Sequence, residues 1–267
     1  MYGTEDYGMR LSDEDCESLG YAKNLLENPT LAARITDLIG RPIEAGIKVL
    51  PQGWADMVNK ATTISLEKAL DVALLTLHDR PRTEAWEKLH KLAVTATGAG
   101  GGAFGLAALP FELPVSTTIM LRSIADIARS EGERLHVIEA KLACLEVFAL
   151  GGRSASDDAN DASYFFIRGL FAKTVSQAAK YIAEKGLATK GAPALVKFIT
   201  QIATRFGASV SQKVAAQAVP GIGAVGGAII NLLFIDHFQS MARGHFIVRR
   251  LERNYTPELV RKEYETL

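Results

Sequence analysis

The stretch VAAQAVPGIGAVGGAIINLLFI, residues 214–235, carries no charged side chain, and Asp236 and His237 follow it at once. A transmembrane helix needs about 20 consecutive apolar residues, so this run is long enough to cross a bilayer. Much of the run is glycine, alanine and proline, however, and these residues add little apolar surface. Small residues instead favour close contact between helices. The run therefore predicts a tightly packed helix, either inside a bundle or against a membrane.

A second uncharged run, LAVTATGAGGGAFGLAALPF, covers residues 92–111 and has the same composition. Three placements stay open for the two runs: the core of a soluble bundle, the membrane surface, and a true membrane span. Pro220 interrupts one run, Glu112 follows the other, and no aromatic or Lys/Arg flank brackets either of them. Transmembrane helices usually carry such flanks, so the soluble core is favoured.

Composition excludes several classes of partner and compartment. Lys plus Arg and Asp plus Glu number 30 each, so no basic field attracts nucleic acid. Cys16 and Cys144 lie far apart and form no CxxC motif, which predicts free thiols in a reducing compartment. The N-terminus is acidic where a signal peptide would be basic and then apolar. We expect a cytoplasmic protein that can lie peripherally on the inner face of the cell membrane.

Helical periodicity and helix-breaking residues predict an all-α fold, and no strand alternation is present. The fold class is a multi-helix bundle around the two Gly/Ala-rich segments. Residues 1–82 form an N-terminal helical subregion and residues 83–267 a helical core, together one compact unit. The predicted helices cover 12–27, 31–39, 42–51, 54–77, 83–94, 116–130, 136–150 and 161–185, then 194 onward, 224–253 and 257 onward. Pro110 and Pro114 are expected to bracket a break, with Ser116 as the next helix cap.

The predicted helix 116–130 carries a polar side formed by Arg122, Asp126 and Arg129. Asp126 is four residues after one arginine and three before the other, so it can pair with both. Arginine suits bidentate recognition of phosphate or carboxylate groups. This side is either an ordinary solvated face or an anion site in which two guanidinium groups hold Asp126.

The predicted helix 224–253 is apolar nearly all round, which is typical of a buried helix. Asp236 and Arg243 lie along one stripe of it, whereas His237 and His245 fall on the apolar side. Buried polar groups must find partners, because an unpaired one is costly. These residues are therefore either satisfied core groups or parts of a polar site in which burial shifts pKa values toward acid–base use.

The functional alternative is a site between helices 116–130 and 224–253. Its candidate catalytic residues are Asp126, Asp236, His237 and His245, and its candidate binding residues are Arg122, Arg129 and Arg243. The two histidines lie too far apart on one helix to hold the same ion, so no metal is expected. The chain lacks a Walker A loop and a GxSxG elbow, and its GAGGGAFG segment follows a helical segment, so no cofactor is expected.

Three long stretches resemble the sequence of a known family: LPVSTTIMLRSIADIARSEGE (113–133), ACLEVFALGGR (143–153) and GAVGGAIINLLFIDHFQSMARGHFIVRRLE (223–252). Together they resemble the EcsC family, bacterial proteins named for a gene beside an ABC transporter. The resemblance covers about residues 85–262 and carries over no catalytic residue. It implies a mostly helical membrane- or transporter-associated accessory protein of unresolved activity. Membrane lipid or an ABC transporter component is then its expected partner, and a hydrolase-like enzyme is the alternative.

Overall fold

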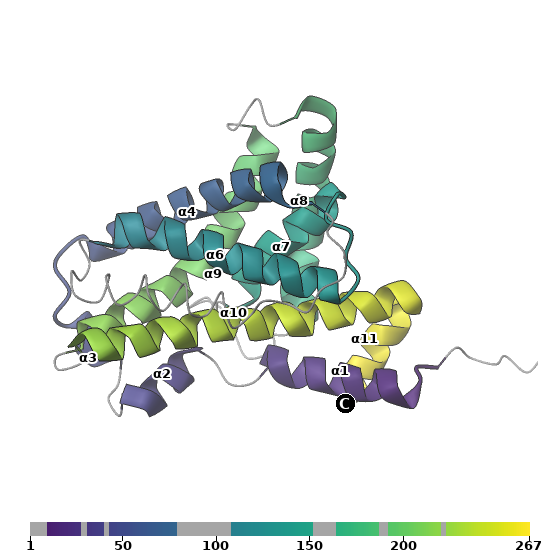
Figure 1. Ribbon diagram of the computed structural model, residues 1–267, viewed down its shortest axis with the longest axis horizontal. Coiled ribbons are helices and arrows are strands. Elements are labelled where there is room, and N and C mark those ends of the chain that lie inside the picture. The colour runs from purple at the N-terminus through teal and green to yellow at the C-terminus, as the bar shows by residue number, and fades with distance from the viewer. Residues whose placement is uncertain are drawn as a thin grey trace, which may run out of the picture.

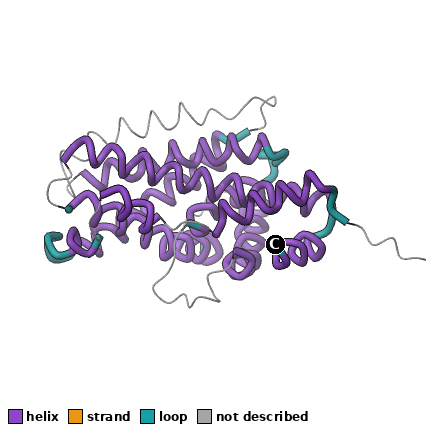
Figure 2. The backbone as a smooth tube through the Cα atoms, turned by 90° about the horizontal axis from the view of Figure 1, so that it is seen from below, coloured by secondary structure: helices purple, strands orange, loops and turns teal. Residues whose placement is uncertain are grey.

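The computed structural model describes residues 10–27, 31–39, 43–78, 108–151, 164–186, 192–219 and 223–267. These residues form ten helices and no strand, which confirms the all-α prediction (Figures 1 and 2). The helices are α1 (Asp13–Glu27), α2 (Leu31–Ile39), α3 (Glu44–Ile47), α4 (Trp54–Thr76), α6 (Leu109–Ser130), α7 (Ile138–Leu150), α8 (Tyr164–Lys185), α9 (Pro193–Ala218), α10 (Gly223–Asn254) and α11 (Pro257–Thr266). The predicted helix 83–94 and residues 92–107 of the uncharged run lie outside the described residues.

Helix α6 begins earlier than predicted and continues through both prolines. Pro110 occupies the first turn, where the backbone N–H has no helical partner, so its ring costs little there. Pro114 removes one backbone hydrogen bond, but it is buried together with Leu113. Ser116 lies inside the helix, and its hydroxyl donates to the Leu113 carbonyl at 3.2 Å. The predicted break was wrong because core packing offsets a single lost hydrogen bond.

Helix α10 runs the length of the molecule and contacts most of the other helices (Figure 1). In this view α1 and α2 lie below it, and α4 and α6 lie above it. Gly244 lets α1 approach closely, because a Cβ there would stand 2.7 Å from Leu26 Cγ and 3.0 Å from the Ala22 carbonyl oxygen. Buried residues of α1, α2 and α4 belong to the same apolar core as those of α6 to α10.

The uncharged run of residues 214–235 is divided between two helices that pack together. Its first part ends α9 and its second part begins α10, and Val214, Ala216, Ile230 and Phe234 are all buried. The Phe234 ring lies 6.0 Å from Phe206 of α9. None of the described helices combines the length and the hydropathy that a membrane crossing requires.

Candidate functional site

The polar residues predicted on α6 pair within that helix or face solvent. Arg129 forms an ion pair with Asp126 and also donates from Nε to the His78 carbonyl at 3.2 Å. Arg122 is exposed. On α10, Asp236 forms its ion pair with Arg34 of α2.

His237 is buried and contacts the end of α7. Its Nε2 donates to the Gly151 carbonyl oxygen at 2.9 Å. Gly151 is needed for this contact, because a Cβ at that position would stand 2.7 Å from the same nitrogen. Burial lowers the pKa of His237 to about 4, so the imidazole is neutral at pH 7.

The candidate residues therefore point to different neighbours. Asp126 pairs within α6, Asp236 turns toward α2, His237 toward α7, and His245 toward α8. Helices α6 and α10 do meet, and Gln239 Nε2 donates to Ser123 Oγ at 2.7 Å. The ion pairs and hydrogen bonds of Asp126, Asp236, His237 and His245 described above thus lead to four different helices.

A different group of charged residues gathers around His245, where α7, α8 and α10 pack together. We call it the polar cluster, and its members are Glu146, Tyr164, Arg168, His245, Arg249 and Glu252. His245 Nδ1 lies 2.9 Å from the Tyr164 hydroxyl. Arg168 binds Glu252 through two hydrogen bonds of 2.7 and 2.6 Å.

Helical spacing explains how the polar cluster assembles. His245, Arg249 and Glu252 follow one another at intervals of four and three residues along α10, so they lie on one side of that helix. Tyr164 and Arg168 are four residues apart in the first turns of α8. Glu146 comes from α7, a helix whose residues from Ala140 to Leu150 are all buried. A carboxyl group is thus placed inside the protein beside two arginines.

Burial governs the protonation of the polar cluster. It raises the pKa of Glu146 to about 7, although the nearby charges of Arg168 and Arg249 oppose this effect. Burial also lowers the pKa of His245 well below its usual value, and both arginines act in the same direction. The pKa of Tyr164 is raised by burial. At neutral pH the histidine and tyrosine are therefore neutral, and Glu146 is close to its titration midpoint.

The hydrogen-bond directions in the polar cluster follow from the chemistry of arginine, which can only donate. Arg168 Nη1 lies 3.4 Å from the Tyr164 oxygen, so this oxygen is an acceptor. The tyrosine proton then points to His245 Nδ1. A neutral imidazole that accepts at Nδ1 carries its proton on Nε2. His245 Nε2 is therefore a buried donor.

A second set of ion pairs fixes the segment after α6 onto α10. Arg249 Nε donates to Glu133 at 2.7 Å, Arg253 also contacts Glu133, and Arg250 donates to Glu131 at 2.7 Å. Burial opposes the ionisation of Glu133, but the hydrogen bonds and charges of Arg249 and Arg253 outweigh it and lower its pKa. The Arg249 guanidinium is thus paired with the Glu133 carboxylate.

Sequence reasoning missed most of the polar cluster. It placed His245 near Glu252 but did not select Glu146, Tyr164 or Arg168. The available signal was Glu146 itself, the single acid within the apolar stretch ACLEVFALGG. A lone carboxyl group in a helix that is apolar on every side must be buried, and burial shifts its pKa.

The end of the molecule on the left of Figure 1 brings together α3, the start of α6, the end of α9 and the start of α10. Gly46 of α3 lies against α9 so closely that a Cβ would stand 1.7 Å from the Ala215 carbonyl oxygen. Lys213 Nζ lies 2.8 and 3.1 Å from the two carboxylate oxygens of Glu112. Lys213 is fully buried and lies 5.1 Å from the Phe234 ring centroid.

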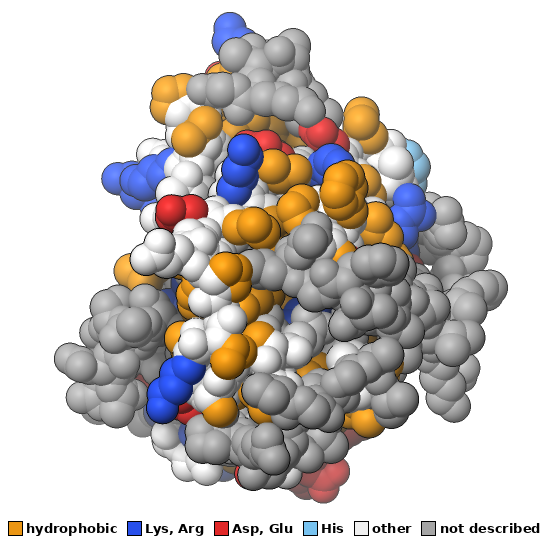
Figure 3. Space-filling model, turned by 90° about the vertical axis from the view of Figure 1, so that its left-hand side faces the viewer, with side chains coloured by type: hydrophobic (Ala, Val, Ile, Leu, Met, Phe, Trp, Pro, Cys, Tyr) orange, Lys and Arg blue, Asp and Glu red, His pale blue; other side chains and the backbone are white. Residues whose placement is uncertain are grey.

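Several large apolar side chains are exposed at this same end, which we call the apolar end. They are Ile47, Val49, Phe111, Val115, Ile229 and Leu232. Phe111 is the most exposed of them, at 79%. Figure 3 looks onto this side and shows hydrophobic side chains scattered over the described surface, with uncharged, basic and acidic groups between them. The apolar end is therefore a solvent-exposed surface that carries several large apolar side chains.

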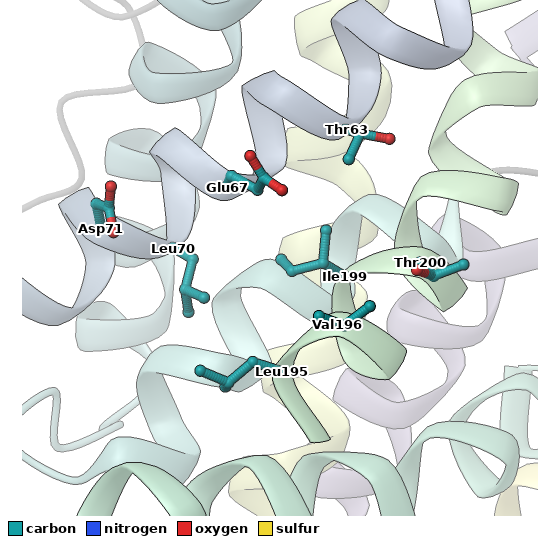
Figure 4. Close-up of a pocket in the computed structure, with 8 residues that line it drawn as sticks. All are labelled: Thr63, Glu67, Leu70, Asp71, Leu195, Val196, Ile199 and Thr200. Carbon is teal, nitrogen blue, oxygen red and sulfur yellow. The ribbon is translucent and has the colours of Figure 1, made fainter. Parts of the chain in front are cut away.

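A pocket of about 140 Å³ opens between α4 and α9 (Figure 4). Leu70, Leu195 and Ile199 supply its buried apolar wall, and Glu67 and Asp71 of α4 supply two carboxylates. None of the predicted site residues lines this pocket. Its lining residues also include no member of the polar cluster or of the apolar end.

The model of the EcsC protein family matches residues 23–251. No curated protein and no solved structure matches the chain. The match begins well before residue 85, where the resemblance of the three motifs began, so it also includes α2, α3 and α4. The chain belongs to the EcsC protein family.

Proposed function

We propose that the protein is an accessory protein that binds the inner face of the cell membrane through its apolar end and serves an ABC transporter there. The observation that carries this proposal is the set of exposed apolar side chains at the junction of α3, α6, α9 and α10. Exposed apolar groups that lie together on a surface are typical of contacts with membranes or other proteins.

Phe111 of α6 and Leu232 of α10 represent the two longer helices at this end, and they are 79% and 37% exposed. Together they present roughly 200 Å² of apolar surface, worth about 5 kcal/mol if all of it left water. A surface-bound protein buries its apolar face only to the depth of the headgroup boundary, so about half of this free energy is expected. That half corresponds to roughly a 100-fold gain in membrane affinity.

The ion pair between Glu112 and Lys213 supports the same placement. Glu112 directly follows the exposed Phe111 in the chain and pairs with the buried Lys213, and a lone charge near lipid would oppose binding. Because the two charges are paired inside the protein, the apolar end can approach the bilayer without removing an unpaired ion from water. This arrangement fits peripheral binding of a folded protein.

Flotation with neutral phosphatidylcholine vesicles tests the proposal. The double variant Phe111→Ser/Leu232→Ser should lose roughly 100-fold in vesicle affinity. The matched control, Leu75→Ser/Leu170→Ser, changes side chains that are 64% and 50% exposed on α4 and α8, and should bind as the wild type does. Binding that survives high salt would support apolar contact. Equal loss in both double variants, or no binding by the wild type, would refute the proposal.

The ABC transporter partner rests on the family resemblance. Crosslinking in intact membranes should join the wild-type protein, but not the Phe111→Ser/Leu232→Ser variant, to a transporter component if membrane binding precedes assembly. The hydrolase-like alternative between α6 and α10 would need Asp126, Asp236 and a histidine in one site, whereas Asp126 pairs with Arg129 and Asp236 pairs with Arg34.

A further inference from the structure

The pocket between α4 and α9 combines a buried apolar wall with a more exposed edge. Leu70, Leu195 and Ile199 of the wall are each no more than 7% exposed, whereas Val196 of the same lining is 49% exposed. The pocket volume of about 140 Å³ is close to that of an apolar cavity of roughly 150 Å³ that holds a benzene molecule. The pocket can therefore take an apolar group of about six carbon atoms.

Helical spacing places acidic groups beside this wall. Thr63, Glu67, Leu70 and Asp71 follow one another at intervals of four, three and one residues, so they form one stripe on α4. Figure 4 shows this stripe on the side of α4 that faces α9. Leu70 thus extends the apolar wall within the same stripe that carries both carboxyl groups.

The polar groups on the α4 side of the pocket are hydrogen-bond acceptors. Thr63 Oγ1 donates to the Asn59 carbonyl oxygen at 3.0 Å, so this hydroxyl offers only its lone pairs to the pocket. The carboxylates of Glu67 and Asp71 accept but do not donate when ionised. The lining residues within the described ranges include these two acids and no lysine, arginine or histidine. A ligand that donates hydrogen bonds and carries a positive charge would complement this side of the pocket.

Size, wall and charge together select one class of ligand. An anion would meet two carboxylates, and a drug-sized molecule occupies a pocket of roughly 300 Å³ or more. We propose that the pocket binds a small organic amine, whose apolar body of about six carbon atoms packs against Leu195 and Ile199 and whose ammonium group lies beside the Glu67 and Asp71 carboxylates. This site is separate from the membrane-binding apolar end, because the two share no residue.

A series of linear alkylamines tests the apolar part of the site. These amines are protonated at pH 7, as lysine is. In nuclear magnetic resonance titrations of the full chain, affinity should rise roughly fourfold for each methylene from butylamine to hexylamine, because each added methylene leaves water. It should then level off at octylamine, because the pocket is full. Shifted amide signals should lie within residues 63–71 and 195–200. An affinity that rises equally from hexylamine to octylamine, or shifts elsewhere in the chain, would overturn the proposal.

Three ligands of equal length test the charge. Hexylamine should bind more tightly than hexanol, and hexanol more tightly than hexanoate. Glu67→Gln should weaken hexylamine binding roughly two- to fivefold, the range expected for an exposed ion pair, and should leave hexanol binding unchanged. Glu17→Gln, which changes an exposed glutamate on α1, is the matched control and should bind both ligands as the wild type does. Equal affinity for all three ligands, or equal effects of the two variants, would contradict a site for a cation.

Two further variants locate the binding surface. Val196→Phe adds bulk at a 49% exposed position of the pocket lining and should weaken hexylamine binding, whereas Val49→Phe, at a 55% exposed position of the apolar end, should not. The Phe111→Ser/Leu232→Ser variant should bind hexylamine with the affinity of the wild type, even though we expect it to lose vesicle binding. If that double variant loses hexylamine, the amine binds the apolar end, and the proposed pocket site is wrong.

Discussion

Replacing Lys213 by methionine removes one half of a buried ion pair and leaves the Glu112 carboxylate without its cation. Lys213 Nζ contacts both carboxylate oxygens at 2.8 and 3.1 Å, and the two side chains are 0% and 10% exposed. Removing one partner of such a pair typically costs about 3–5 kcal/mol, because the remaining charge stays buried and unpaired. Since Glu112 keeps slight access to water, we expect a loss near 3 kcal/mol for Lys213→Met.

The double variant Glu112→Gln/Lys213→Met should recover most of this loss, because neither residue then carries a charge. We expect it to lie within about 1 kcal/mol of the wild type. Urea unfolding of the wild type, both single variants and the double variant gives the coupling free energy directly. For a chain of this size, the Lys213→Met loss should also lower the melting temperature by roughly 6–12 °C.

An exposed ion pair on α11 provides the comparison. Arg261 and Glu265 are 2.8 Å apart, but their side chains are 62% and 57% exposed. Breaking this pair should cost no more than about 0.5 kcal/mol. Additive losses at Glu112 and Lys213, or a coupling as small as that of the α11 pair, would refute the account of a buried pair that holds α6 to α9.

Three further outcomes follow from single residues. Gly46→Ala should cost about 3 kcal/mol or more in urea unfolding, because its Cβ would stand 1.7 Å from the Ala215 carbonyl oxygen; a neutral substitution would contradict the close contact. His237 has a pKa lowered from 6.5 to about 4, so its contribution to stability is lost as the pH falls from 6.5 toward 4; His237→Gln should remove roughly 3 kcal/mol of this acid dependence. Burial raises the pKa of Cys144 to about 12, so this thiol should react with iodoacetamide only after unfolding. Half-buried Cys16 should react in the folded protein, and mass spectrometry of the peptides would distinguish the two sites.

The sequence predicted helix positions well wherever local chemistry sets both ends. The expected 224–253 helix appears as Gly223–Asn254, and Thr256 caps the next helix by accepting from the Leu259 N–H, as its Thr-Pro pair predicted. The start of α6 was missed for a physical reason. Proline is a strong local signal against a helix, but burial of Leu113 and Pro114 is a tertiary effect that no local pattern contains.

The candidate site was harder to predict because its contacts join distant parts of the chain. Periodicity places Asp236 and His237 on different sides of one helix, but it cannot say that Arg34 or Gly151 will meet them. The Arg168–Glu252 pair spans 84 positions, so no spacing rule connects its members. Only the isolated Glu146 in an apolar helix was a usable local signal, and its meaning depends on what packs around it.

Membrane binding through the apolar end is the central claim, and fluorescence quenching tests it most directly. A tryptophan placed by Phe111→Trp should shift its emission to shorter wavelength when neutral vesicles are added, and brominated acyl chains should quench the added signal. Leu75→Trp, at a 64% exposed position on α4, should keep the emission of a water-exposed indole. If Phe111→Trp also stays water-exposed, or if both positions are quenched equally, the apolar end is not the membrane-binding surface.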